Sequence, residues 1–185
     1  INTIGSWVLE NACLQVRDWN LLFGKEQNFE LAVNLSGLQL AHHDICDQIQ
    51  GVLSYTRFDP KNLHLEVTET MLVTHKEMAK DSISGLRELG ISISIDDFGT
   101  GYSSLNYLQQ YQFDTLKIDK SFIQDMDTTG KGRQLVRTLM LLAQDLQMEV
   151  VAEGVETEPQ FDRLKGMKCP CVQGYYFSKP LPAKQ

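Results

Sequence analysis

The chain has few of the features that define several protein classes. It has four cysteines and no Cys-x-x-Cys pair, so a structural zinc site is not expected, and reduced thiols are typical of a cytosolic domain. No apolar run is long enough to span a bilayer, and no signal peptide is visible. Basic residues are also scarce, with 17 Lys and Arg against 24 Asp and Glu, which argues against binding to polymeric nucleic acid.

What remains is the composition of one globular domain. The 185 residues are 42% hydrophobic and 22% charged, which is enough apolar material for a buried core. The formal net charge is -7. An anionic ligand would therefore need local help, either from metal ions or from a few placed lysines.

The most informative segment covers residues 91–105. Isoleucines at 91, 93 and 95 alternate with serines, which predicts a strand. The strand leads into Asp96 and Asp97, then into a glycine-containing turn and serines that can cap a helix starting near residue 105. Two adjacent carboxylates repel each other, so a divalent cation is the usual counter-charge if both stay ionised. An exposed Asp-Asp turn is the alternative at this point.

Short apolar strands alternate with helical patterns along the chain. Strands are expected over 29–34, 63–69, 91–97, 115–119, 149–153 and 172–175. Helices are expected over 4–19, 44–57, 77–89, 105–111, 132–146 and 158–164, with a polar loop over 128–133. This order predicts a parallel sheet with right-handed crossovers, and a closed barrel of the TIM type explains more of the pattern than an open sheet does.

Each expected strand carries a polar residue at or near its carboxyl end, and such ends converge on the active-site face of a TIM-type barrel. These residues are Asn34, Glu66, Asp96, Lys117, Glu153 and Gln173. With Asp97, the amide and carboxylates form an all-oxygen ligand set, which favours Mg²⁺ or Mn²⁺ over zinc or copper. Two such ions would activate water and hold a phosphodiester during in-line attack.

Lys117 has two possible roles beside these acids. It could orient water or stabilise phosphate charge, or it could form a Schiff base as in a barrel aldolase. The surrounding carboxylates favour the first role because they would keep the amine protonated. The histidines at 42, 43, 64 and 75 do not recur at metal-ligand spacing, so we interpret them as surface or packing residues.

The motifs together resemble the EAL domain, over essentially the whole chain. They are Val33-Asn34-Leu35-Ser36, Leu65-Glu66-Val67-Thr68-Glu69, the run from Asp96 to Leu105, Lys117-Ile118-Asp119, Glu153-Gly154-Val155-Glu156-Thr157 and Gln173-Gly174-Tyr175. The resemblance implies a modified TIM-like (β/α)8 barrel that opens cyclic di-GMP to pGpG with two Mg²⁺ or Mn²⁺ ions. It further implies a homodimer, and an upstream GGDEF or sensory domain in a full-length protein that can be membrane-anchored.

The resemblance also implies roles for single residues. The metal shell would be Asn34, Glu66, Asp96, Asp97 and Glu153. Lys117 would position or deprotonate the attacking water, supported by Gln173, Ser36 and Gly174. Glu69 would anchor the loop formed by Phe98, Gly99, Thr100, Gly101, Tyr102 and Ser103, and Glu156 would be a further active-site acid.

One departure from the family pattern is visible. The Glu-Ala-Leu segment that names the family is absent, and the resemblance implies it on a first strand ahead of residue 1. Residues 1–185 are therefore expected to form an N-terminally incomplete EAL-type domain that lacks this strand. The alternative to an enzyme is a catalytically inactive cyclic di-GMP receptor or dimerisation module. Such proteins usually lose metal ligands or the loop after the paired aspartates, and both are retained here.

Overall fold

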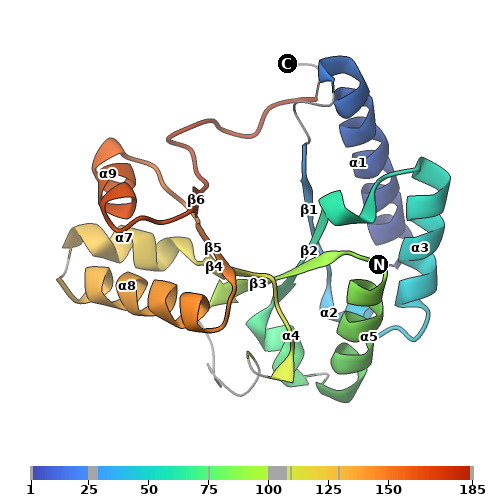
Figure 1. Cartoon of the computed structure of the whole chain (residues 1–185), viewed down its shortest axis with the longest axis horizontal. Coiled ribbons are helices and arrows are strands. Elements are labelled where there is room, and N and C mark those ends of the chain that lie inside the picture. Colours follow the sequence, from blue (N-terminus) through green and yellow to red (C-terminus); the bar gives the residue numbers. More distant parts are fainter. Residues whose placement is uncertain are drawn as a thin grey trace. The chain divides into compact units, whose positions relative to one another are not determined.

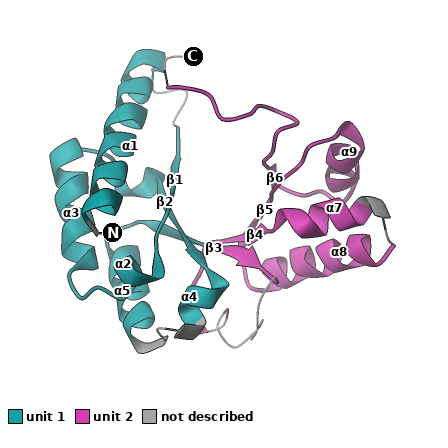
Figure 2. Ribbon diagram, turned by 180° about the vertical axis from the view of Figure 1, so that it is seen from behind, with its two compact units in different colours: residues 1–94 teal, residues 95–185 magenta. Residues whose placement is uncertain are grey.

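The computed structural model describes residues 2–24, 29–74, 76–99, 108, 110–128 and 130–183 (Figure 1). The chain divides into two compact units, residues 1–94 (unit 1) and 95–185 (unit 2), each described by itself (Figure 2). Across the described residues, no helix combines the length and the apolar character that crossing a membrane requires.

Unit 1 contains two paired parallel strands, β1 (Leu31–Asn34) and β2 (Leu63–Thr68). The strand β3 (Ser92–Phe98) begins in unit 1 and ends in unit 2. The helical segments of unit 1 are α1 (Asn2–Phe23), α2 (Gly37–Leu40), α3 (Ile45–Thr56), the 3-10 turn η1 (Pro60–Asn62), α4 (Glu69–Thr74) and α5 (Lys76–Glu88).

The burial of β2 follows the period of a strand. Leu63, Leu65 and Val67 are buried, whereas His64 and Glu66 on the opposite face are only half-buried. The apolar face packs in the core of unit 1, and α1 packs against both α3 and β1. Glu66 is therefore held at a fixed position near the end of a strand whose other face is locked by packing.

Cys13 on α1 is fully buried, and burial raises the pKa of its thiol to about 11, against a smaller lowering by a hydrogen bond with Thr56. We expect iodoacetamide at pH 7.5 to alkylate Cys13 about 100-fold more slowly than the exposed Cys171, because the thiolate is the reactive form. Peptide mass spectrometry over time measures both rates. In urea the two cysteines should react alike, and equal rates in native buffer would contradict the burial.

Unit 2 contains the parallel strands β4 (Thr115–Ile118), β5 (Glu149–Ala152) and β6 (Cys171–Val172), paired in chain order. Its helices are α7 (Lys120–Thr128), α8 (Gly130–Asp145) and α9 (Glu158–Gly166). Figures 1 and 2 show α7 and α8 side by side, and α8 also contacts β4 and β5. Side chains of β4 are buried at every position, so this strand lies in the core of the unit.

The polar loop predicted over residues 128–133 is wrong. Thr128 ends α7, and Gly130 begins α8. Gly132 is buried, and a Cβ atom on it would lie 2.5 Å from the backbone carbonyl of Asp125. The glycine therefore permits close packing of α8 against α7 rather than a flexible turn.

Candidate active site

Lys117 is a buried cation on β4, a strand of unit 2 whose side chains are all buried. Only 5% of the residue is exposed, and an ammonium group in such a place is costly unless it is paired. Its Nζ atom lies 2.7 Å from Glu153 Oε1 and 3.4 Å from Asp96 Oδ1. The two carboxylates come from the end of β3 and the residue after β5, so the carboxyl ends of the strands bring three of the predicted site residues together.

Asp97 lies next to this ion pair in an unusual backbone conformation. Its φ of 54° is in the left-handed region, and its N–H donates to Asp96 Oδ1 at 3.0 Å. Burial raises the pKa of the Asp97 carboxyl, and the negative charges of Asp96 and Asp119 raise it further, against the opposing effect of two lysines. The two adjacent carboxylates thus repel each other, as predicted from the sequence.

A hollow of about 340 Å³ opens beside these acids within unit 2. Its lining residues are Asp97, Asp119, Lys120, Glu153, Gly154, Glu156, Gln173, Gly174 and Tyr175. The predicted residues Glu156, Gln173 and Gly174 therefore lie in the same pocket as Asp97 and Glu153. Carboxylates, an amide and one lysine surround a space that an aromatic ring borders on one side.

The wall of this pocket is built by backbone contacts between two loops. Gln173 N donates to Ala152 O at 2.8 Å, and Val155 N donates to Gln173 O at 3.1 Å. Tyr176 N donates to Val155 O at 2.9 Å. A Cβ atom on Gly174 would collide with the backbone of Val155, so the residue at this position must be glycine for the two loops to meet.

Replacing Gly174 with alanine is expected to lower the free energy of unfolding by about 1–3 kcal/mol, because backbone atoms cannot move aside as a flexible side chain can. Chemical denaturation measures the effect. Gly166→Ala in the same unit is the matched control, since nothing lies within 4 Å of its added Cβ atom. An unchanged stability in Gly174→Ala would show that the loops can separate.

Asp119 and Lys120 line the pocket, although the sequence analysis gave neither of them a role in the site. Asp119 Oδ1 accepts hydrogen bonds from Ser121 Oγ at 2.6 Å and from Ser121 N at 3.0 Å. Burial acts to raise the pKa of Asp119, but these hydrogen bonds outweigh it, and the pKa is lowered. Asp119 directly follows β4, and an aspartate at such a position is a typical start of a helix. This pattern was the available sequence signal for Asp119 and for Lys120, which begins α7.

The predicted residues of unit 1 form their own arrangement. Asn34 and Glu66 lie opposite each other at the paired ends of β1 and β2. Ser36 forms a capping box at the start of α2, where its Oγ accepts from Gln39 N at 3.3 Å. Glu69 is buried at the start of α4, with 3% of the residue exposed. Asn34 and Glu66 thus provide two adjacent oxygen donors, and Ser36 has a structural role in this turn.

The predicted loop is described only at its beginning. Phe98 is buried, and Gly99 has a φ of 94°, where an added Cβ atom would lie 2.9 Å from the ring of Phe122. Thr100, Gly101, Tyr102 and Ser103 lie outside the described residues. The start of this loop is therefore fixed by a buried phenylalanine and a left-handed glycine.

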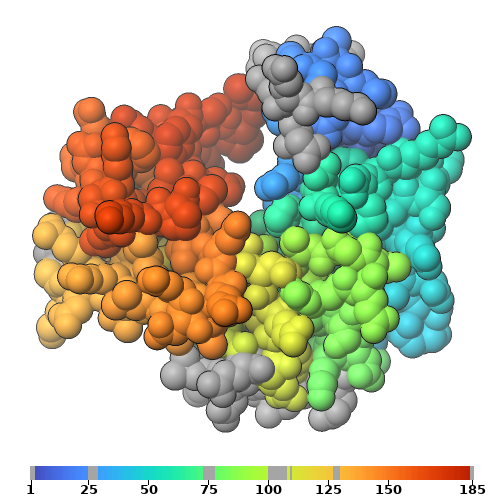
Figure 3. Space-filling view, in the orientation of Figure 1, coloured from blue at the N-terminus to red at the C-terminus, as the bar shows by residue number. Residues whose placement is uncertain are grey.

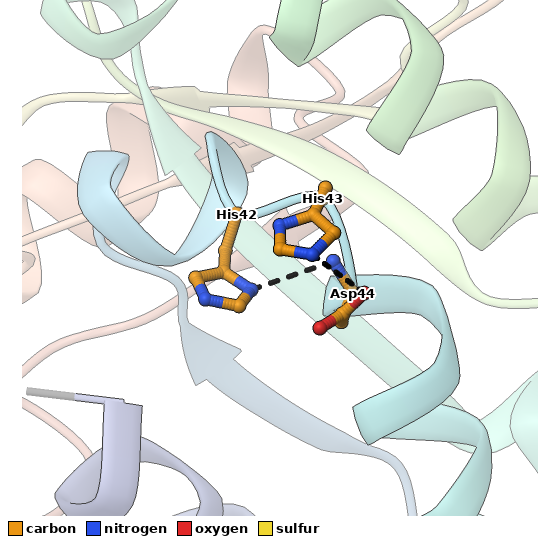
Figure 4. A group of neighbouring side chains, drawn as sticks. All are labelled: His42, His43 and Asp44. Carbon is orange, nitrogen blue, oxygen red and sulfur yellow. Dashed lines mark hydrogen bonds and ion pairs between the residues drawn. The ribbon is translucent and has the colours of Figure 1, made fainter.

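A second group of potential metal ligands lies in the turn between α2 and α3 (Figure 4). The rings of His42 and His43 stack with centroids 4.9 Å apart, and His43 Nε2 lies 3.1 Å from Asp44 Oδ1. Within the described ranges, these residues are the only three or more His, Cys, Asp or Glu whose ligand atoms all lie within 4.8 Å of one another. The sequence interpretation missed this group because a turn brings consecutive residues together without helical spacing.

The donor chemistry of the unit 2 pocket fits a hard divalent cation. Asp97 and Glu153 line the pocket with carboxylate oxygens, and the described lining contains no histidine or cysteine. Asp96 lies beside it, linked to Glu153 through Lys117. A cation would relieve the same repulsion that Lys117 relieves by pairing with Asp96 and Glu153. In unit 1, Asn34 and Glu66 offer donors of the same type.

Residues 1–180 match the model of the EAL domain family, and the chain belongs to this family. The fold class is therefore α/β of the TIM-like barrel type, as predicted. MucR of Pseudomonas aeruginosa, named as a bifunctional diguanylate cyclase and cyclic di-GMP phosphodiesterase, is 40% identical over 98% of this chain and 26% of its own length. The chain spans about a quarter of the length of the curated relatives it matches.

Two solved structures of EAL proteins are similar to this chain over nearly its whole length. The chain is similar to the PaMucR phosphodiesterase in complex with c-di-GMP, with a TM-score of 0.93 and 40% identity over 100% of this chain and 74% of that one. It is also similar to BlrP1 of Klebsiella pneumoniae in a calcium and cyclic di-GMP complex, with a TM-score of 0.86 and 31% identity over 95% of this chain and 44% of that one.

Proposed function

We propose that this chain is a cyclic di-GMP phosphodiesterase that opens the cyclic dinucleotide to linear pGpG. In the reaction, a water oxygen forms a bond to phosphorus, the bond from phosphorus to the 3′ oxygen breaks, and that oxygen receives a proton. The observation that carries the proposal is Lys117, buried on β4 and paired with Asp96 and Glu153 beside the pocket. EAL relatives named as cyclic di-GMP phosphodiesterases support the choice of substrate.

Residues in and beside the pocket have separate roles in the proposed reaction. Lys117 holds its positive charge next to the reacting phosphate and orients the attacking water, and its ion pairs with Asp96 and Glu153 hold the ammonium group in place. Tyr175 offers an aromatic face to a guanine base at the pocket edge. Gln173 and Glu156 offer polar side chains to the substrate, and Gly174 holds the loop that carries Gln173.

Two Mg²⁺ or Mn²⁺ ions would be held by Asp96, Asp97 and Glu153 with Asn34 and Glu66, and Glu69 would anchor the loop that begins at Phe98. Bound divalent ions supply Lewis acidity, which neutralises phosphate charge and lowers the pKa of water. The all-oxygen donor set supports this assignment over a zinc or copper centre.

The test is hydrolysis of cyclic di-GMP with Mg²⁺ or Mn²⁺, followed by chromatography of pGpG. The assay compares residues 1–185 with a form extended upstream to include the Glu-Ala-Leu strand that the family resemblance implies. Release of pGpG by either form supports the enzyme. If neither form releases pGpG and both bind the nucleotide, the receptor alternative replaces it.

Partners beyond the substrate follow from the same family membership. We propose that the chain forms a homodimer and that its parent protein carries a GGDEF or sensory domain upstream, as part of a cytoplasmic signalling module. Several relatives are much longer proteins, including the oxygen sensor DosP of Escherichia coli, which agrees with a regulated module. Light scattering on the purified chain and on its parent measures the oligomeric state directly.

A further inference from the structure

A basic groove lies on unit 2 at the amino ends of β5 and β6, between α8 and the segment that follows α9. It consists of two adjoining hollows of about 580 and 810 Å³. The hollows share Arg137, Leu141, Met167 and Lys168, so they form one continuous depression. The helix α8, coloured gold to orange, lies on the surface in the space-filling view (Figure 3). Each hollow is in the size range of small-molecule sites.

The groove concentrates positive charge on an acidic chain. Arg133 and Arg137 are four residues apart on α8, so their side chains share one helix face, and Lys168 comes from the segment after α9. The described residues that line the two hollows include no aspartate or glutamate. None of the three cations forms an ion pair with a described carboxylate. An anion is the ligand that these charges would stabilise.

The rest of the lining is apolar with a few amides. Its apolar residues include Met140, Leu141, Met148 and Met167, and Leu141 is 53% exposed. Methionine side chains are polarisable and adapt to the flat face of an aromatic ring. The amides of Gln144 and Gln147 offer both donors and acceptors at the same wall. An aromatic base with polar edges matches these surroundings, whereas inorganic phosphate alone would leave them unused.

We propose that this groove is a second ligand site, which binds a nucleoside polyphosphate. The phosphates pair with Arg133, Arg137 and Lys168, and the base lies against the methionines. The site is separate from the carboxylate pocket because Met148 precedes β5 and Glu153 follows it. Five residue steps along an extended strand place these two positions about 16 Å apart.

Isothermal titration of the whole chain with GTP, ATP, guanosine and inorganic triphosphate tests the site. EDTA is present so that divalent ions do not recruit nucleotide to the carboxylate pocket. We expect a nucleoside triphosphate to bind about 10-fold more tightly than inorganic triphosphate and guanosine to bind more weakly than either. Equal binding of triphosphate and nucleotide, or no nucleotide binding at about 1 mM, would overturn the proposal.

Charge reversals locate the binding. Arg137→Glu is expected to weaken nucleotide binding by at least about 10-fold, since it removes one ion pair and adds a repulsion. Lys131→Glu makes the same charge change on the same helix outside the groove lining, and it should alter binding by less than about 2-fold. Similar losses in both variants would mean that net charge, not the groove, is responsible.

Lys168→Glu provides a variant that leaves α8 intact. It changes the opposite wall of the groove and should weaken nucleotide binding as Arg137→Glu does. Thermal unfolding of each variant confirms that it is folded before its affinity is compared. Full binding by Lys168→Glu would remove the proposed pairing of phosphate with both walls.

Discussion

Replacing Lys117 with methionine is expected to lower kcat for cyclic di-GMP hydrolysis by about 10²–10³-fold, because a positive charge aimed at the reacting phosphate is lost. The variant should also lose about 3 kcal/mol of unfolding free energy. Without the ammonium, Asp96 and Glu153 face each other with side chains only 13% and 21% exposed. Steady-state kinetics and chemical denaturation measure the two effects separately.

Addition of Mn²⁺ separates the two roles of this lysine. The cation should restore most of the stability lost in Lys117→Met, because it replaces the positive charge between the carboxylates, but it should not restore kcat. Lys131→Met, at an exposed position on α8, is the control and should change neither quantity measurably. Wild-type kcat in Lys117→Met would remove the lysine from the proposed reaction.

Replacing Asp96 with alanine is expected to weaken Mn²⁺ binding and to lower the hydrolysis rate by at least about 100-fold, while the fold is retained. The fold should survive because Ile93 and Ile95 keep β3 packed, and Lys117 retains Glu153 at 2.7 Å. Electron paramagnetic resonance counts bound Mn²⁺, and chromatography measures pGpG.

The exposed Asp145 at the end of α8 supplies the comparison for Asp96. Asp145→Ala makes the same chemical change on the surface and should leave Mn²⁺ binding and hydrolysis unchanged. If Asp96→Ala binds Mn²⁺ as the unaltered chain does, the assignment of this carboxylate to the metal shell fails. If it binds Mn²⁺ normally but does not hydrolyse, Asp96 acts on the substrate instead.

The strands and the charged residues at their ends were the most predictable part of the fold. A strand is present near each of the six predicted places, although β6 covers only Cys171–Val172 and not the predicted residues 172–175. The strand β4 illustrates why, since Thr115–Ile118 is short and β-branched at both ends. A lysine inside such a segment is conspicuous, so Lys117 could be selected as a candidate site residue from the sequence. The pairing of Lys117 with Glu153 was not, because it joins residues 36 positions apart.

The short helices were the least predictable part. The helix α7 follows Asp119, and its buried apolar residues are Ile123 and Met126, a pattern too brief to display helical periodicity. Its stability comes instead from α8, which Gly132 allows to approach closely. A contact between two helices is not visible in either local pattern, so the sequence analysis assigned a loop to residues 128–133, where α7 ends and α8 begins. No helix was predicted over residues 120–127, so Lys120, the first residue of α7, was not selected as part of the pocket wall.

The loop contact at Gly174 bears on how this pocket can change over evolutionary time. Hydrogen bonds of 2.8 to 3.1 Å join the two loops through main-chain atoms of Ala152, Val155, Gln173 and Tyr176. Main-chain bonds do not depend on side-chain identity, so Glu156, Gln173 or Tyr175 can be exchanged while the wall keeps its shape. Point substitutions at these positions can therefore change the selectivity for one dinucleotide over another, provided that Gly174, where the two loops meet, is retained.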